Sequence, residues 1–287
     1  MRNFNESTIT DAVIDRIKDA PDARIRQISA SLIRHLHDFV RDVRLTEAEW
    51  VYAINFLTRT GQTCDGNRQE FILLSDTLGV SMLVDAINHA SPGATETTVL
   101  GPFYVENPPE YPAGADISGT LEGDPLYVQG RVTSTGGAPL ANAVVDVWHS
   151  DKEGYYDVQH LEQTEGLAGR ARLRTDADGV YRFWSIKPAA YPIPYDGPVG
   201  DMLTAQARHP WRPAHVHFMI EAPDHEKLTT HVFVSGDQYL DSDAVFGVKD
   251  SLIGDFVRHE AGTAPDGRNL DVPFFTLGYD FVLRQGE

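Results

Sequence analysis

The 287-residue sequence contains a single cysteine, Cys64. One cysteine excludes an intrachain disulfide and any metal site built from a cysteine cluster. No apolar run is long enough to span a membrane, and the N-terminal stretch lacks the apolar core of a signal peptide. Lys and Arg number 24 against 42 Asp and Glu, a net charge of −18, which disfavours nucleic acid and anionic membranes as partners. We expect a cytoplasmic protein with no membrane insertion.

Two common catalytic signatures are also missing. There is no glycine-rich phosphate-binding loop and no G-x-S-x-G nucleophile motif, which argues against a P-loop enzyme or a serine hydrolase of that type. Hydrophobic residues make up 41% of the chain, an ordinary globular composition with ample length to bury a core.

The first ninety or so residues have the apolar periodicity of amphipathic helices. Thr46 to Glu49 forms a capping box that begins one of them. A further helical pattern runs from Gln69 to Ala90 and breaks at Ser91-Pro92-Gly93. We interpret the apolar stripes as core or helix–helix packing, with a partner surface or an apolar ligand groove as the alternative. The stripe residues are Ile25, Ile28, Leu32, Leu36, Phe39 and Val43, followed by Trp50, Ala53, Ile54 and Leu57.

After Pro92 the sequence changes to short β-rich runs separated by turns. Two of the turns are Ser134–Gly137 and Asp176–Gly179. The predicted strands cover residues 126–132, 143–149, 180–186, 214–221 and 228–236. Many short strands of this kind favour a β-sandwich or barrel. We therefore predict a mixed α and β fold: a helical linker or dimerisation domain (1–93) and a β-sandwich catalytic domain (94–287).

The stretch RPAHVHFMI, residues 212–220, places two histidines two positions apart in an apolar strand. Successive strand residues point to opposite faces, so His215 and His217 share one face while Val216 and Phe218 occupy the other. An H-x-H pair is a metal site only if further ligands converge on it; otherwise these are two ordinary strand histidines.

Candidates for the remaining ligands are a histidine and two pairs of tyrosines. His149 ends a predicted strand, and Tyr155 and Tyr156 follow it closely. Tyr191 and Tyr195 lie in the proline-rich loop KPAAYPIPYDGP, which holds a fixed shape without regular hydrogen bonding. From the residues alone each of these is equally a packing residue, and Arg212 is equally a surface arginine.

Four separated blocks occur in an order that resembles the intradiol ring-cleaving dioxygenases. They are VVDVWHSDKEGYYD, KPAAYPIPYDGP, RHPWRPAHVHF and LTTHVFVSGDQYLDSDAVFG. The similarity runs from about Leu100 to Phe256, and within the family it is greatest to members that act on hydroxyquinol. The helical segment resembles the family's linker domain. That likeness implies a homodimer whose paired helices enclose an apolar tunnel able to hold a lipid.

The resemblance implies one non-haem Fe(III) per subunit, held by Tyr156, Tyr191, His215 and His217. Two phenolates and two neutral imidazoles suit this hard cation, because coordination to a cation removes the phenol proton. A substrate with two adjacent hydroxyls then chelates the iron, and Tyr191 is the ligand implied to leave and take up a proton. Arg212 is implied to lie beside the ring, where a fixed cation stabilises developing negative charge.

The implied reaction cleaves hydroxyquinol (1,2,4-trihydroxybenzene) with O2 between its adjacent hydroxylated carbons, giving 3-hydroxy-cis,cis-muconate or maleylacetate. Leu73 and Asp76 share one helix face, and Asp76 is our hypothetical acceptor for the third hydroxyl. The residues expected around the substrate are Leu73, Asp76, Val99, Leu100, Gly101, Pro102, Phe103, Ile193, Pro194, Arg212 and Val245.

The sequence leaves alternatives open for the substrate and for the class of protein. Catechol or chlorocatechol is the alternative substrate. His231 stands where catechol-type members carry glutamine, and it is expected beside the metal ligands, where it tunes them or accepts a proton. A ferrous site of two histidines and one carboxylate is a rival enzyme, and a non-catalytic β-sandwich with structural zinc is a rival of another class. The structural-zinc alternative would need further ligands, and no third histidine is evident in the sequence that converges on His215 and His217.

Overall fold

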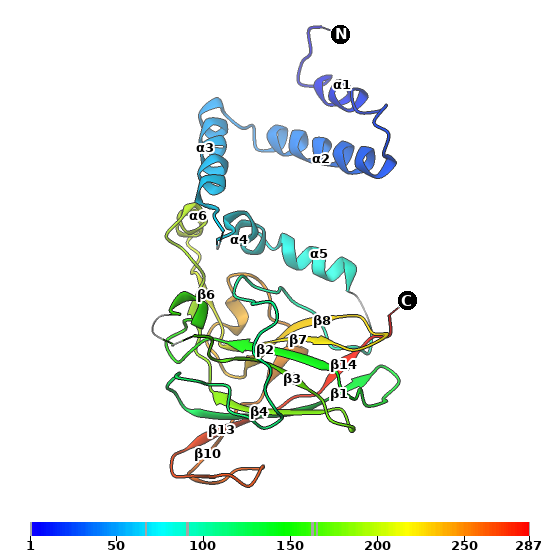
Figure 1. The fold of residues 1–287 in the computed structure, drawn as a ribbon. Coiled ribbons are helices and arrows are strands. Elements are labelled where there is room, and N and C mark those ends of the chain that lie inside the picture. Colours follow the sequence, from blue (N-terminus) through cyan, green and yellow to red (C-terminus); the bar gives the residue numbers. More distant parts are fainter. Residues whose placement is uncertain (1, 67, 90–91, 162–163, 165, 287) are drawn as a thin grey trace. The chain divides into compact units, whose positions relative to one another are not determined.

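The computed structural model describes every residue except 1, 67, 90–91, 162–163, 165 and 287 (Figure 1). The chain divides into two compact units, residues 1–59 and residues 60–287. Helices α4 (Glu70–Thr77) and α5 (Val80–Asn88) lie in the second unit. The domain boundary predicted near residue 93 stays a prediction, and Ala90 and Ser91 at that point are outside the described residues.

The first unit is helical, as predicted. It contains α1 (Ile9–Asp15) and α2 (Ala23–Asp42), and α3 (Glu47–Thr63) begins in it. The predicted capping box is confirmed, because the Glu49 carboxylate accepts the Thr46 N–H at 2.8 Å and the Thr46 hydroxyl accepts the Glu49 N–H at 3.3 Å. Asp22 caps α2 by accepting the N–H groups of Arg24 and Ile25.

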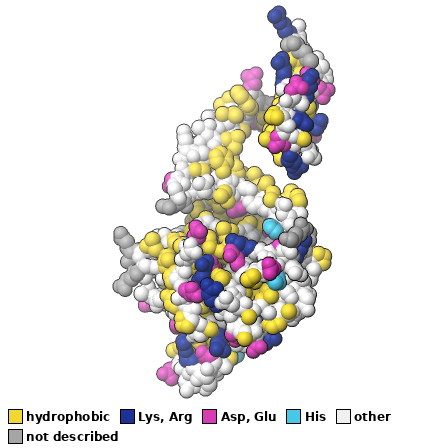
Figure 2. Space-filling model, turned by 45° about the vertical axis from the view of Figure 1, so that its right-hand side comes forward, with side chains coloured by type: hydrophobic (Ala, Val, Ile, Leu, Met, Phe, Trp, Pro, Cys, Tyr) yellow, Lys and Arg dark blue, Asp and Glu magenta, His cyan; other side chains and the backbone are white. Residues whose placement is uncertain are grey.

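The expected burial of the apolar stripes within the chain is wrong. No residue of α2 is buried, and the stripe residues of α2 and α3 are exposed at the surface of this chain. Hydrophobic side chains accordingly lie at the surface of these helical segments (yellow in Figure 2). Periodicity identifies the apolar face of a helix but not the surface that covers it. The helices therefore form as predicted, although their apolar stripes are not buried in a core of this chain.

The second unit contains two β-sheets packed face to face. One sheet has the order β3-β2-β7-β8-β9, and the other has the order β10-β13-β1-β14 with β4 also paired to β1. The strands of the first sheet are β2 (Val144–His149), β3 (Arg170–Arg174), β7 (His215–Glu221), β8 (Leu228–Val234) and β9 (Ile253–Gly254). Those of the second are β1 (Pro125–Ser134), β4 (Val180–Ile186), β10 (Val257–His259), β13 (Phe274–Gly278) and β14 (Phe281–Leu283).

One hydrophobic core fills the space between the sheets, so the predicted β-sandwich is confirmed. It contains Val145 and Phe218 from the first sheet and Val128 and Phe183 from the second. All five predicted strands are present, with ends that differ by at most two residues. Both predicted turns form, since the N–H groups of Gly137 and Gly179 donate to the carbonyls of Ser134 and Asp176.

Shorter elements cover the outer face of the first sheet or connect strands of either sheet. The helical ones are α4, α5, α6 (Pro198–Ala205) and the 3-10 turns Asp157–Gln159, Leu240–Ser242 and Asp250–Leu252. The short strands are β5 (Tyr191–Pro192), β6 (Trp211–Arg212), β11 (Gly262–Thr263) and β12 (Asn269–Leu270). In the described part of the chain, none of the helices is both long enough and apolar enough to cross a bilayer.

Phe218 tests the sandwich core. Its ring is fully buried between the sheets against Tyr181 and Phe281. Phe218→Ala is expected to lower the free energy of unfolding by about 3–5 kcal/mol, because it removes apolar contacts and leaves a cavity. Phe71→Ala, at a half-exposed ring on α4, is the matched control and should cost less than about 1 kcal/mol. Equal losses in denaturant unfolding would contradict the assignment of the core.

Candidate active site

Strand β7 separates two environments through its alternating side chains. Val216, Phe218 and Ile220 point into the sandwich core. His215, His217 and Met219 point the other way, and Met219 packs in a second cluster with Trp148. Both histidines are nevertheless buried, because helices and loops cover this outer face. The alternation predicted from RPAHVHFMI is confirmed, and it places two imidazoles side by side in a dry environment.

Tyr156 approaches these imidazoles from the loop after β2. Its Oη lies 2.9 Å from His217 Nε2 and 3.5 Å from His215 Nε2, and the two Nε2 atoms are 3.1 Å apart. The Tyr156 side chain is 1% exposed, whereas that of its neighbour Tyr155 is 46% exposed. Three groups with oxygen or nitrogen lone pairs therefore converge within hydrogen-bonding distance.

Tyr191 completes the cluster from the proline-rich loop. Its ring centroid lies 5.4 Å from that of Tyr156 and 5.6 Å from that of His215. Gly154 allows the two tyrosine loops to approach: its φ is +92°, and a Cβ there would lie 2.8 Å from the Tyr191 Cβ. Tyr195, at 58% exposed, points to solvent, while Tyr191 is 4% exposed.

Burial keeps the donor atoms neutral in the absence of a cation. It lowers the pKa of His215 to about 3, with the Arg212 charge acting in the same direction, and it lowers that of His217 well below the usual value. Burial likewise raises the pKa of the Tyr156 phenol well above its ordinary value. The site therefore offers two uncharged imidazoles and a phenol that ionises only if positive charge is supplied.

The hydrogen-bond pattern of these groups suits a metal ion. His215 Nδ1 lies 2.7 Å from the Pro213 carbonyl and must donate to it, so its Nε2 carries a lone pair directed at the cluster. His217 Nδ1 has no hydrogen-bond partner among the described residues. A cation between the two Nε2 atoms and the phenol oxygen would accept these lone pairs and lower the phenol pKa. Neutral nitrogens and a hard phenolate oxygen fit a ferric ion.

His231 is a third histidine at the same place, so the expectation that no third histidine converges is wrong. It pairs with His217 across β7 and β8, and its ring stacks on that of His215 with centroids 4.6 Å apart. One ring nitrogen of each of the three histidines lies within 4.8 Å of the others. The period-two pattern of β8 already placed His231 on this face, but the register that aligns it with His217 is a tertiary feature.

Arg212 is buried rather than exposed at the surface. Its Nη1 lies 3.5 Å from Tyr191 Oη, and its Nε and Nη2 donate to the two oxygens of Asp243 at 3.0 and 3.2 Å. Asp243 is a residue that sequence reasoning missed. The signal for it was indirect, since a buried arginine requires an acidic partner and Asp243 lies in the motif DSDAVFG.

A cavity of about 790 Å³ opens beside Tyr191 and Arg212. Every residue expected around the substrate lines it: Leu73, Asp76, Val99, Leu100, Gly101, Pro102, Phe103, Ile193, Pro194, Arg212 and Val245. Gly101 is required for the close approach of this wall, because its φ is +77° and a Cβ would lie 3.1 Å from His217 Cε1. The lining also includes polar residues that were not expected, among them Ser75, Ser81 and Thr98.

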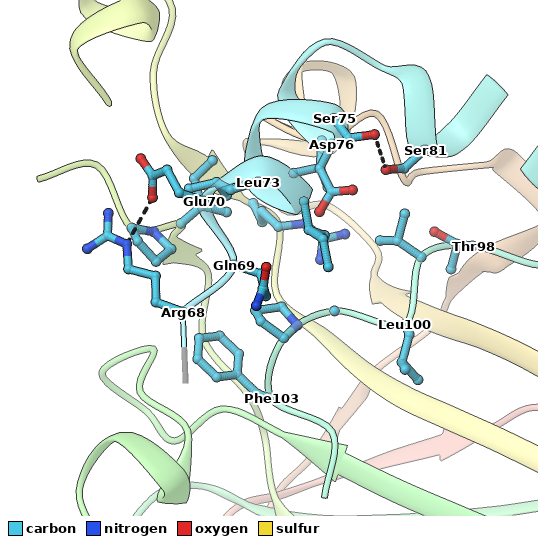
Figure 3. Close-up of a pocket in the computed structure, with 18 of the residues that line it drawn as sticks. Arg68, Gln69, Glu70, Leu73, Ser75, Asp76, Ser81, Thr98, Leu100 and Phe103 are labelled. Carbon is cyan, nitrogen blue, oxygen red and sulfur yellow. Dashed lines mark hydrogen bonds and ion pairs between the residues drawn. The ribbon is translucent and has the colours of Figure 1, made fainter. Parts of the chain in front are cut away.

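Helices α4 and α5 supply acidic groups to this cavity: Glu70 and Asp76 come from α4, and Asp85 comes from α5. Leu73 and Asp76 lie on one buried face, as their spacing predicts. Figure 3 shows the Asp76 carboxylate turned into the pocket beside the hydrogen-bonded pair Ser75 and Ser81. Burial raises the pKa of Asp76, while a hydrogen bond to Ser81 and the charge of Arg212 oppose this increase.

His149 is not part of the cluster, although it was a candidate ligand. Its Nε2 lies 2.6 Å from the Ser185 hydroxyl and its Nδ1 lies 2.7 Å from the Ser150 carbonyl. Both ring nitrogens are therefore used: Nε2 joins β2 to Ser185 of β4, and Nδ1 bonds locally to the next residue, which is a structural role.

Comparison with known proteins gives the class to which this fold and site correspond. The family model described as "Dioxygenase" matches residues 99–285, and "Catechol dioxygenase N terminus" matches residues 22–96. An intradiol ring-cleavage dioxygenase of Aspergillus niger is 43% identical over 100% of this chain and 87% of its own length. The chain belongs to the intradiol ring-cleaving dioxygenases and is an enzyme of that family.

More similar relatives have more specific names. A 6-chlorohydroxyquinol 1,2-dioxygenase of Cupriavidus pinatubonensis is 55% identical over 99% of each chain. A hydroxyquinol 1,2-dioxygenase of Corynebacterium glutamicum is 50% identical over 98% of this chain and 94% of its own. The solved structure of hydroxyquinol 1,2-dioxygenase from Pseudomonas putida matches with a TM-score of 0.92 at 50% identity, covering 98% of both chains.

Proposed function

We propose that this protein is a non-haem Fe(III) dioxygenase, with one iron per subunit, that cleaves hydroxyquinol between its adjacent hydroxylated carbons. The second substrate is O2, and the product is 3-hydroxy-cis,cis-muconate or maleylacetate. The observation that carries the substrate assignment is the buried carboxylate of Asp76 in the cavity beside the tyrosine–histidine cluster. The names of the relatives that are 50–55% identical support the same substrate class.

The proposed iron ligands are Tyr156, Tyr191, His215 and His217. Ferric iron held there would supply the Lewis acidity that makes the aromatic ring reactive toward O2. Tyr191 would act as the base, its phenolate oxygen taking up a proton from a substrate hydroxyl. Arg212 Nη1 faces the same oxygen at 3.5 Å and therefore lies where it can stabilise negative charge on the tyrosine or the ring.

His231 supports the proposed ligands without replacing one of them. Its ring lies edge-on against His217, with centroids 4.1 Å apart, and stacks on His215. These contacts restrict rotation of both imidazoles and keep their Nε2 atoms directed at Tyr156.

A chlorinated hydroxyquinol is the second candidate substrate. The cavity of about 790 Å³ leaves room around a single ring for an added chlorine, and the relative at 55% identity is named for 6-chlorohydroxyquinol. The apolar wall formed by Leu73, Ile193 and Val245 suits such a substituent.

We also propose that the chain forms a homodimer through its N-terminal helical domain (residues 1–93), with each iron site formed within one subunit. The apolar stripes of α2 and α3, exposed in the single chain, support this assembly. In the proposed dimer, the same stripes would line an apolar tunnel between the paired helices that is able to hold a lipid.

Tyr156→Phe tests the metal site. A ferric phenolate absorbs visible light, so the iron-loaded wild-type protein is expected to be coloured and the variant to lose part or all of that absorption. Tyr155→Phe is the matched control at an exposed neighbouring ring and should retain the spectrum. Visible absorption and iron content per chain measure the result. A colourless wild-type protein that binds iron would contradict the phenolate ligands.

Asp76→Leu tests the substrate assignment through oxygen uptake on hydroxyquinol and catechol, measured side by side. The wild-type protein is expected to prefer hydroxyquinol, and the variant to lose about 1–3 kcal/mol of that preference, or roughly 5- to 150-fold. Asp76→Asn keeps one acceptor oxygen and should lose less. A ratio of kcat/KM values that is the same in all three proteins would reject the role of Asp76.

Sedimentation velocity tests the assembly. The wild-type protein is expected to sediment as a dimer at micromolar concentration. Leu32→Glu combined with Leu36→Glu should shift it to the monomer, because charges replace two apolar residues of the stripe. Arg34→Glu changes the charge on the opposite face of α2 and should leave the dimer intact. A wild-type monomer would refute the proposed assembly.

A further inference from the structure

Arg212 and Asp76 line the same cavity with opposite charges. An arginine and a carboxylate in a buried pocket would ordinarily pair, since burial strengthens their attraction. Among the described residues, however, the ion-pair partner of Arg212 is Asp243, and no ion pair joins Arg212 to Asp76. The cavity thus keeps a cation and a carboxylate unpaired with each other.

We propose that Asp243 is a positioning residue that holds Arg212 away from Asp76, so that both groups remain available to the substrate. The proposal rests on the proposed function, in which Asp76 accepts the third hydroxyl and Arg212 stabilises charge at the other side of the ring. Asp243 itself lies outside the lining of the cavity and acts only through Arg212.

The geometry of the Arg212–Asp243 pair fixes the guanidinium in one orientation. Nε and Nη2 donate to separate oxygens of Asp243, which is a two-point contact that prevents rotation of the plane. Nη1 is then directed at Tyr191 Oη. A single-point contact would leave the long side chain of Arg212 free to turn toward Asp76.

Asp243 is itself anchored by its backbone surroundings. Its oxygens also accept the N–H groups of Val245 at 3.3 Å and Gly247 at 2.9 Å. The next residue, Ala244, donates its N–H to the Trp211 carbonyl at 3.1 Å, which ties the loop to the strand that carries Arg212. Four hydrogen bonds to one carboxylate leave it little freedom to move.

The loop fits so closely behind Arg212 that it requires a glycine. A Cβ on Gly247 would lie 2.9 Å from Arg212 Nη2 and 3.2 Å from Asp243 Oδ2. Although burial opposes it, the charge of Arg212 together with these hydrogen bonds holds the pKa of Asp243 below its ordinary value. The ion pair is therefore present across the neutral pH range, whereas the ion pairs that the described residues form do not include Asp76.

Asp243→Asn is the decisive variant, because it keeps the size of the side chain while removing its charge and one acceptor. Arg212 should then turn toward Asp76. The kcat on both substrates is expected to fall, and the hydroxyquinol-to-catechol ratio of kcat/KM should fall at least about tenfold, since Asp76 is now occupied. A crystal structure of the variant shows directly whether the guanidinium has moved, independently of turnover.

Asp146→Asn is the matched control. Asp146 forms the same two-point contact with Arg172, at 2.7 Å for both bonds, but does not line the cavity. Both variants are expected to lower the melting temperature, and only Asp243→Asn should change the substrate ratio. If both lower the melting temperature and neither changes the ratio, Asp243 is merely structural and the proposal is wrong.

A double-mutant cycle with Asp76→Asn separates this inference from the proposed function. If Asp243 protects Asp76, the effects of the two substitutions on the ratio are not additive, and Asp243→Asn changes little once Asp76 is replaced. Additive effects would overturn the proposal. If the wild-type protein does not turn over hydroxyquinol at all, the proposed function fails. The variant's crystal structure then still decides whether Asp243 restrains Arg212.

Discussion

The alternation of side chains along β7 is the constraint on which the rest of the site depends. One face of the strand completes the sandwich core through Val216, Phe218 and Ile220, and this burial fixes the register of the strand in its sheet. The other face must then present His215 and His217 side by side. A slip of one residue would place both imidazoles in the core and three apolar side chains on the face of the histidine–tyrosine cluster. The register of β7 therefore determines both the stability of the sandwich and the position of the candidate ligands.

Elements that are distant in sequence cover the outer face of that sheet and shield it from water. Helix α4, the loop at residues 98–103 and the proline-rich loop at residues 187–198 all border the cavity. Their packing excludes water from the site, and this burial lowers the pKa values of His215 and His217 and raises that of the Tyr156 phenol, so these three groups are neutral when no cation is present. In the proposed function, a bound ferric ion would be held by the phenol oxygens of the tyrosine loops together with the imidazoles of β7, and it would stabilise this cluster of uncharged donors.

The charged side chains of the cavity matter through the partners that they pair with, not through the net charge of the protein. The protein as a whole carries a net charge of −18, yet Arg212 and Asp76, which both line the cavity, are not paired with each other, because Arg212 is paired with Asp243. Arg212 is restrained by Asp243 and the loop that follows it. Asp76 lies on the buried face of α4. In the proposed function this separation would give a small aromatic substrate two different polar contacts, which is how a pocket can distinguish rings that differ by one hydroxyl.

The sequence by itself determined the local features of this protein. Period-two alternation defined the strands and the face of His215 and His217, period-three spacing put Leu73 and Asp76 together, and four ordered motifs identified the family. Only the tertiary structure decided which distant groups meet. It brought His231 into register with His217, paired Arg212 with Asp243 and left the stripes of α2 and α3 uncovered in the single chain. The physical reason is that periodicity records which face of an element is apolar, whereas contacts depend on strand register and on surfaces contributed by residues far away in the chain.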